Sequence, residues 1–172
     1  MKARSYGFMV ALAIFAIDQF LKYWVTGPLG INHVGDQLFI LPFFNFTYTE
    51  NNGISLGLLN ATTEIGRWML VGLTGAIAIG VAFWMGREKS RIDQMALGLV
   101  LGGALGNILD RVRHGYVTDF ADLHFGEWPP FLIFNVGDAA ISIAVVILLL
   151  RAFLSRKDHE TGSDPEERHE HA

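Results

Sequence analysis

Residues 102–138 read GGALGNILDRVRHGYVTDFADLHFGEWPPFLIFNVGD, and the rest of the chain is organised around them. It begins as a glycine-rich apolar helix, reaches a polar cluster around Asp110, and continues through a loop that carries Asp119. A second apolar helix then begins near Asp138. Ionisable side chains at or inside apolar segments of membrane length are costly, so each of them is a candidate functional residue.

The composition of the 172-residue chain is that of a membrane protein with a single domain. Hydrophobic residues make up 51% of it and charged residues 17%, and the apolar residues are concentrated in long runs. Most of the net charge of −4 belongs to a polar tail at residues 155–172, which we expect to be disordered. The remaining body is close to neutral, which argues against nucleic-acid binding. Because the chain has no cysteine, it contains no disulfide, Cys-ligated zinc or thiol nucleophile.

Four segments are long and apolar enough to span a bilayer, because helical residues rise about 1.5 Å each and the hydrocarbon core is about 30 Å thick. They are residues 8–25, 68–86, 92–109 and 131–153. The first has a basic start like a signal peptide, but a signal peptide needs a cleavage site of small residues after the apolar run. The run instead continues through Asp18, Lys22 and Tyr23, so we expect the segment to be retained.

Small residues recur every four positions on the two central spans. They are Gly98, Gly102 and Gly106 on the third span, and Gly72, Ala76 and Gly80 on the second. Small residues at this spacing let helix backbones approach closely inside lipid. We therefore expect both rows to be helix-packing surfaces.

The distribution of basic residues predicts the orientation of the chain. Lys and Arg precede the first span, follow the fourth and fill the short link at residues 87–91, whereas residues 26–65 contain none. The positive-inside rule therefore places both termini in the cytoplasm and the loops at 26–67 and 110–130 outside, with Arg67, Arg111 and Arg113 as exceptions.

The first outer loop has the pattern of a small antiparallel sheet. Phe44, Phe46 and Tyr48 alternate with polar residues, as expected of a half-buried strand. Residues 38–41 form a second strand candidate that Pro42 interrupts, and residues 52–53 read Asn-Gly, a turn signal. The predicted fold is an all-α polytopic membrane protein, with four transmembrane helices and an extracytoplasmic antiparallel β-sheet in the first outer loop.

The predicted topology brings the polar groups of the spans to one layer near the outer face. They are Asp18, Asn107, Asp110, Arg111, Asp119, Asn135 and Asp138. Each also has a structural interpretation. Asp18 and Lys22 have the spacing of an ion pair on one helix face, and Asn107 and Arg111 have the spacing of residues that join helices.

Two carboxylates held close together in a layer of low dielectric constant cannot both ionise, so one keeps a proton. Aspartic proteolysis uses this state, with one Asp as base toward a water and the other as acid toward the carbonyl. A serine-protease or metalloprotease mechanism is less well supported, because the sequence has no HExxH or GxSxG motif. His114 and His124 are single loop residues that we interpret as interfacial, and the sequence predicts no metal or cofactor.

Four segments of the sequence resemble motifs of lipoprotein signal peptidase, also called signal peptidase II. The resemblance is carried by DQFLK at residues 18–22, ENNGISLG at 50–57, GGALGNILDRVRHGYVTDF at 102–120 and FNVGDAAI at 134–141. It implies an aspartic endopeptidase of the bacterial inner membrane that cuts the signal peptide from a prolipoprotein just before its diacylglyceryl-modified cysteine. It also implies that the surface sheet cradles the substrate and that globomycin-type peptides inhibit.

Carried over motif by motif, the resemblance makes Asp119 and Asp138 the catalytic pair. The residues with supporting or substrate-binding roles would be Asp18, Lys22, Asn51, Asn107, Arg111 and Asn135, with Asp110 in structural pairing. Two positions depart from the family pattern. Gly137 replaces the usual alanine before the last aspartate, and residues 53–56 read Gly-Ile-Ser-Leu where the family has glycine, two alanines and phenylalanine.

Two other classes of function compete with the protease. A transporter or proton channel would need polar groups through the depth of the membrane, whereas the inner halves of the spans, such as 8–14 and 143–150, carry no charge. A non-enzymatic membrane assembly factor fits the glycine rows but leaves the aspartates unexplained.

Overall fold

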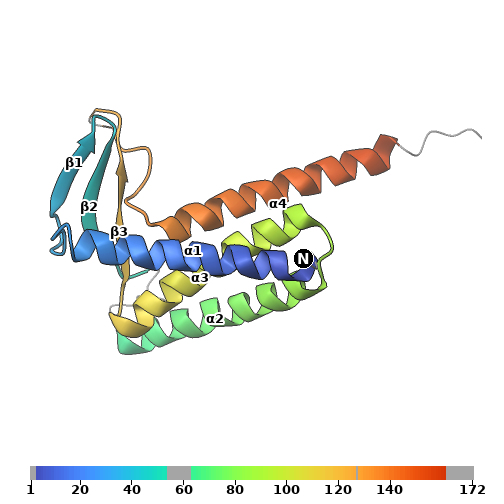
Figure 1. Cartoon of the computed structure of the whole chain (residues 1–172), viewed down its shortest axis with the longest axis horizontal. Coiled ribbons are helices and arrows are strands. Elements are labelled where there is room, and N and C mark those ends of the chain that lie inside the picture. The colour runs from blue at the N-terminus through green and yellow to red at the C-terminus, as the bar shows by residue number, and fades with distance from the viewer. Residues whose placement is uncertain (1–2, 54–62, 127, 162–172) are drawn as a thin grey trace, which may run out of the picture.

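The structure is a computed structural model that describes residues 3–53, 63–126 and 128–161. Its elements follow the chain as α1 (Ala3–Thr26), β1 (Gln37–Leu41), β2 (Phe44–Asn51), α2 (Glu64–Arg87), α3 (Arg91–Arg113), β3 (Val117–Leu123) and α4 (Val136–Thr161). All four helices are long and apolar enough to cross a membrane. The helices form one bundle, and the three strands stand at the end where α1 ends and α4 begins (Figure 1).

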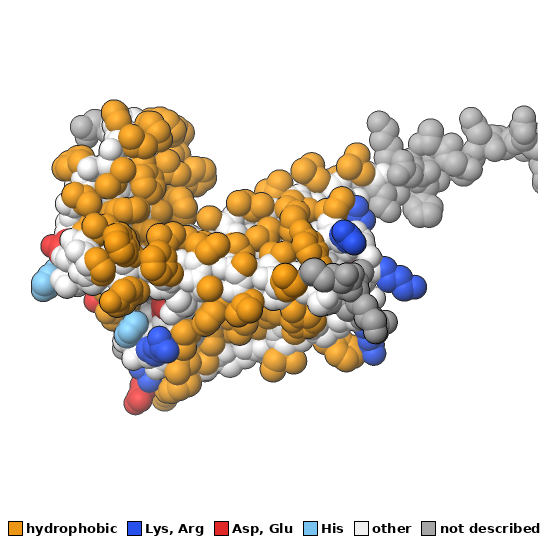
Figure 2. Space-filling model, in the orientation of Figure 1, with side chains coloured by type: hydrophobic (Ala, Val, Ile, Leu, Met, Phe, Trp, Pro, Cys, Tyr) orange, Lys and Arg blue, Asp and Glu red, His pale blue; other side chains and the backbone are white. Residues whose placement is uncertain are grey.

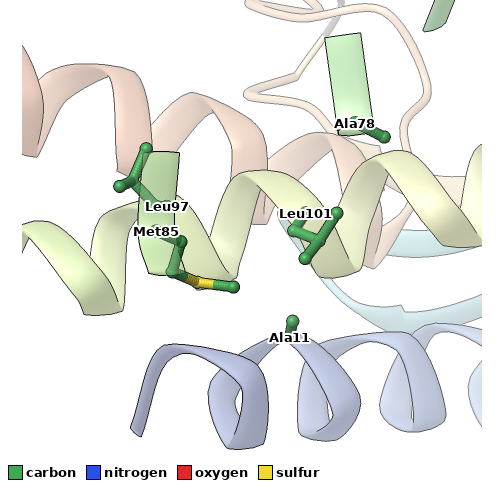
Figure 3. Close-up of a cluster of buried hydrophobic side chains, with 5 residues drawn as sticks. All are labelled: Ala11, Ala78, Met85, Leu97 and Leu101. Atoms are coloured by element: carbon green, nitrogen blue, oxygen red, sulfur yellow. The ribbon is translucent and has the colours of Figure 1, made fainter. Parts of the chain in front are cut away.

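Helix α3 is the centre of the bundle, because it packs against α1, α2 and α4. Half of the α3 span is buried, against 17–22% of the other three. A cluster of Ala11, Ala78, Met85, Leu97 and Leu101 fills the contact between α1, α2 and α3 (Figure 3). The outer surface of the bundle is covered with large apolar side chains, as expected where lipid replaces water (Figure 2).

The glycine row on α3 is a packing surface, as the sequence predicts. A Cβ added at Gly98 would come within 2.5 Å of the Gly7 carbonyl oxygen, and one at Gly102 equally close to that of Ala11. The same prediction for α2 is wrong. Among the described residues, nothing lies within 4 Å of a Cβ built at Gly72 or Gly80. Small residues permit a close approach between helices, but they do not require one.

Specific side chains bind the free backbone groups at the helix ends. The side chain of Thr63 accepts a hydrogen bond from Gly66 N and caps α2, and Ser90 caps α3 in the same way. Gln94 is fully buried at the inner end of the bundle. It donates to the Glu88 carbonyl and accepts from Gly7 N, which satisfies a backbone donor in the first turns of α1.

The sheet is antiparallel in the order β1-β2-β3. The two predicted strands of the first loop are present as β1 and β2, which confirms the predicted fold class. The third strand, β3, was not predicted and comes from the second outer loop. Its residue Phe120 packs with Val25, Ile31 and Tyr48 in a second apolar cluster, which fixes the sheet to the outer end of α1.

Helix α4 begins five residues later than its predicted span, and it continues to Thr161, past the predicted end at residue 153. The late start has a clear cause. Phe134 is extended and pairs with Ala121 of β3, so the helix starts only after Asn135. Residues 54–56 and the tail from 162 onward lie outside the described residues.

Candidate functional site at the junction of sheet and bundle

The site is built where β3 meets the first turn of α4. Phe134 N donates to Ala121 O at 3.1 Å, and Ala121 N donates to Phe134 O at 2.8 Å. This bridge places the next residue, Asn135, beside β3. The side chain of Asn135 then contacts Asp119, although the two residues are sixteen positions apart in the chain.

Asp119 is buried and is held by two side-chain amides. Asn135 Nδ2 donates to its Oδ1 at 2.6 Å, and Asn51 Nδ2 donates to its Oδ2 at 3.0 Å. The pKa of Asp119 is raised from 3.8 to about 6, chiefly by burial and secondly by the negative charge of Asp138, against the two amide hydrogen bonds that lower it. Asp119 therefore takes up a proton at a higher pH than a solvent-exposed aspartate does.

Asp138 occupies the first turn of α4 and is half-buried. Its backbone N–H donates to Asn135 Oδ1 at 2.9 Å, while Asn135 N donates to Asp138 Oδ2 at 3.4 Å. This reciprocal arrangement is a capping box, and the start of a helix favours negative charge. Asn107 Nδ2 of α3 donates to Asp138 Oδ1 at 2.8 Å, which fixes the carboxylate from a second helix.

A buried ionic network lies directly beneath the two carboxylates. Lys22 Nζ is 2.8 Å from Asp18 Oδ2 and 2.8 Å from Asp110 Oδ2, and it donates to Asn107 Oδ1 at 3.2 Å. The three charged side chains are at most 6% exposed. Asp18 and Lys22 thus form the ion pair that their spacing predicts, and Asp110 from α3 completes it. Gly106 makes room for the network, since a Cβ there would collide with Asp18 Oδ2.

Gln19 is a member of this network that sequence reasoning missed. Its Nε2 donates to Asp110 Oδ1 at 3.0 Å and to Asp18 Oδ2 at 3.2 Å. A neutral side chain on an apolar helix gives no charge signal, so only its position next to Asp18 could have drawn attention to it.

Arg111 lies near the other predicted site residues, but within the described ranges 3–53, 63–126 and 128–161 it makes no hydrogen bond or salt bridge to them. It is half-buried and interacts electrostatically with Asp138, Asp119 and Asp110. Within the described part of the chain, its Nε has no hydrogen-bond partner. The other eight predicted residues are connected to one another by hydrogen bonds or ion pairs.

The two histidines lie apart from the carboxylates. His114 caps the end of α3 and stacks near Tyr116, with 5.9 Å between ring centroids. His124 Nε2 lies 3.5 Å from Asn45 Nδ2 on the sheet. The described residues contain no group of three side chains that could hold a metal ion.

Gly137, which departs from the family pattern, sits in a close contact between helices. A Cβ added there would lie 2.9 Å from the Gly103 carbonyl oxygen and 3.0 Å from Asn135 Oδ1. Its N–H donates to Asp18 Oδ1 at 2.9 Å. Of the other departure, only Gly53 is described. It has a φ of +88°, which favours glycine, and it donates to Asn51 Oδ1 at 2.9 Å.

Comparison with known proteins identifies the family of the chain. The family model for signal peptidase (SPase) II matches residues 10–154. A lipoprotein signal peptidase from Sphingopyxis alaskensis is 52% identical over 87% of this chain and 86% of its own, and one from Rhizorhabdus wittichii is 50% identical over 90% and 89%.

Two solved structures of bacterial membrane enzymes share the fold. One has a TM-score of 0.74 at 27% identity over 94% of both chains. The other has a TM-score of 0.72 at 28% identity over 85% of this chain and 91% of its own. The chain therefore belongs to the signal peptidase II family, the lipoprotein signal peptidases, and is a multi-pass bacterial membrane protease.

Proposed function

We propose that this chain is an intramembrane aspartic endopeptidase that removes the signal peptide from diacylglyceryl-modified prolipoproteins. It cuts immediately before the lipidated cysteine, and Asp119 and Asp138 activate the attacking water. One observation carries the proposal. A single residue, Asn135, binds both carboxylates, with its side-chain amide on Asp119 and its backbone N–H on Asp138. The carboxylates of β3 and α4 are thereby both bound to the same residue.

The electrostatics of the pair suit this chemistry. The pKa of Asp119 is raised to about 6, first by burial and then by the charge of Asp138. Asp138 sits at a helix N-terminus, which favours its charged form. In this proposal Asp119 acts as the acid, because its pKa is raised, and Asp138 acts as the base. A bound apolar substrate excludes water and strengthens this division.

The reaction proceeds in two steps. The water adds to the carbonyl carbon of the scissile peptide while Asp138 takes one of its protons. Asp119 donates a hydrogen bond to the carbonyl oxygen, where negative charge develops. The tetrahedral intermediate then collapses with cleavage of the C–N bond, and the leaving amine takes up the proton held by Asp138. The products are a signal peptide with a free carboxylate and a lipoprotein with a free amine on its lipidated cysteine.

The distribution of basic residues supports an orientation with both termini in the cytoplasm and the active site at the outer face of the inner membrane. Arg87 ends α2, Arg91 begins α3, and Arg151 pairs with Asp93, all at the end of the bundle away from the sheet. Basic residues favour the cytoplasmic side. In this proposal residues 1–154 are the membrane peptidase domain and residues 155–172 a cytoplasmic tail.

The surface of the sheet supports the proposed lipid-modified substrate. Large apolar side chains on β1 and after β3 are exposed on the part of the molecule that carries Asp119, among them Phe39, Phe125 and Trp128. Such a surface fits an acylated peptide that leaves the bilayer only partly. A peptide inhibitor of the globomycin type would occupy the same surface and place its backbone against the aspartates.

The test is cleavage of a diacylated prolipoprotein and of its unlipidated form by purified protein in lipid or detergent. We expect cleavage of the lipidated form alone, and loss of cleavage in Asp119→Asn and in Asp138→Asn. Asp93→Asn, a carboxylate at the opposite end of the bundle, is the matched control and should cleave normally. Normal cleavage by either Asp119→Asn or Asp138→Asn would overturn the assignment.

A further inference from the structure

The buried ionic network contacts the chain immediately before each of the two proposed catalytic aspartates. Asp110 Oδ2 accepts a hydrogen bond from Thr118 N at 3.2 Å, and Thr118 precedes Asp119. Asp18 Oδ1 accepts from Gly137 N at 2.9 Å, and Gly137 precedes Asp138. The same kind of contact is thus made twice, by two carboxylates from different helices.

Lys22 joins these two contacts into one unit. Its ammonium group is 2.8 Å from a carboxylate oxygen of Asp18 and 2.8 Å from one of Asp110. It also donates to Asn107 Oδ1, which leaves the Asn107 amide nitrogen free to donate to Asp138. All three protons of the ammonium group are therefore donated. Each goes to a residue that contacts either Asp138 or the backbone next to one of the two aspartates.

Stability alone explains the network poorly. A buried ion pair loses about as much in desolvation as it gains in attraction, so apolar residues of similar volume would hold α1 against α3 at least as well. Buried and fully satisfied polar networks instead fix one geometry among several. The geometry fixed here is the position of two backbone N–H groups, each one residue away from a proposed catalytic carboxylate.

We propose that Asp18, Lys22 and Asp110 form a clamp that sets the separation of Asp119 and Asp138 by holding the N–H groups of Thr118 and Gly137. The clamp residues are positioning residues, since they act on the aspartates through the backbone. Asp110 holds the β3 side of the pair, Asp18 holds the α4 side, and Lys22 fixes the two sides to each other. This inference rests on the proposed aspartic mechanism.

The test begins with Lys22→Met, which removes the charge but keeps the length of the side chain. We expect kcat to fall at least tenfold with KM within twofold, because the substrate surface is intact and only the spacing of the pair changes. Lys22→Met leaves two buried carboxylates without a counter-ion. The triple variant Asp18→Asn/Lys22→Met/Asp110→Asn, which buries no uncompensated charge, is therefore measured beside it and should show the same loss of kcat.

A double-mutant cycle separates a clamp from two independent contacts. If Lys22 joins the two sides, Asp18→Asn and Asp110→Asn each lower kcat, and the double variant is no worse than the more damaged single variant. Independent contacts would multiply the two losses. The control is Arg151→Met, which removes the ion pair of Arg151 and Asp93 between α3 and α4 far from the site. It should lower the melting temperature without changing kcat.

Three results would overturn the clamp. They are an unchanged kcat in a folded Lys22→Met or triple variant, multiplied losses in the cycle, and loss of folded protein in every clamp variant with no folded variant of reduced kcat. Asp119→Asn and Asp138→Asn are assayed in parallel. If they are inactive while the Lys22 variants keep full kcat, the clamp is wrong and the aspartic mechanism stands. If they cleave normally, the mechanism itself is wrong.

Discussion

Asn135 Nδ2 lies 2.6 Å from Asp119 Oδ1, a contact between the residue that caps α4 and a residue of β3. Asn135 is fully buried and also donates to Asn107 Oδ1 at 3.1 Å. Its own oxygen accepts from Asp138 N. One side chain therefore uses all of its polar atoms to join a strand and two helices at the site.

Replacing Asn135 separates its two functions. Asn135→Ser and Asn135→Ala both lose the buried amide contacts with Asp119 and Asn107, but the serine keeps a good helix cap, so we expect Asn135→Ser to be more stable than Asn135→Ala by about 1 kcal/mol. The shorter side chain cannot hold Asp119 in the same place, and misplacement of a reacting group by about 1 Å lowers kcat about a hundredfold. Asn135→Ala should lose both the cap and the activity. Equal kcat in Asn135→Ser and the unchanged protein, measured on the lipidated substrate, would show that the contact with Asp119 does not matter for catalysis.

The raised pKa of Asp119 predicts a pH dependence of stability. The pKa is 3.8 in the unfolded chain and about 6 in the folded protein, because burial disfavours the charged form. The contribution of the Asp119 carboxyl to the free energy of unfolding is complete below about pH 4. It is lost as the pH rises to about 6, where Asp119 also ionises in the folded protein. A shift of about two units corresponds to about 3 kcal/mol.

The corresponding measurement compares unfolding of the unchanged protein with that of Asp119→Asn from pH 4 to pH 7. Asparagine does not titrate, so the stability of the unchanged protein should fall relative to the variant as pH rises. The two curves should then run parallel above about pH 7. Curves that stay parallel over the whole range would mean that Asp119 titrates normally.

The coupling between the two aspartates can be measured directly. The charge of Asp138 is the second cause of the raised pKa of Asp119. Removing that charge in Asp138→Asn should therefore lower the pKa of Asp119, while the burial that is the first cause persists. The carboxyl band of Asp119 in infrared difference spectra, followed against pH, reports the shift. An unchanged midpoint would place the two groups too far apart to share a proton.

The sequence predicted the helices well because the membrane imposes a simple rule on them. Length and apolarity alone define a span, and all four were found. The strand β3 was missed because its residues, VTDFADL, are buried on both faces at its start and show no clean alternation. Its partner β2 lies far away in the chain, and local pattern carries no information about such pairing.

The sequence drew attention to most residues of the candidate site, but apart from the pair of Asp18 and Lys22 it did not predict how they are connected. Charges in apolar segments drew attention to Asp18, Asp110 and Asp138. That Asp18 binds the N–H of Gly137, 119 positions away, depends on how α1 and α4 pack against α3. The start of α4 was placed too early for a similar reason. Phe131 and Phe134 are as apolar as the span, but Phe134 pairs with β3 instead.

The difference between the glycine rows on α3 and α2 gives a further prediction. Gly102→Ala would bring a methyl group within 2.5 Å of the Ala11 carbonyl oxygen, so α1 and α3 must separate. Overpacking of this kind destabilises by about 1–3 kcal/mol. Gly72→Ala, on α2, adds a methyl group that meets no described atom within 4 Å.

Both variants make the same chemical change in a helix, which makes them a matched pair. The intrinsic helix preference of alanine favours both by up to about 1 kcal/mol, so any difference between them comes from packing. We expect Gly72→Ala to melt at or above the temperature of the unchanged protein in detergent, and Gly102→Ala to melt several degrees below it. Because α1 carries Asp18 and Lys22, separation of α1 from α3 should also lower kcat in Gly102→Ala. Equal melting temperatures for the two variants would contradict the close contact between α1 and α3.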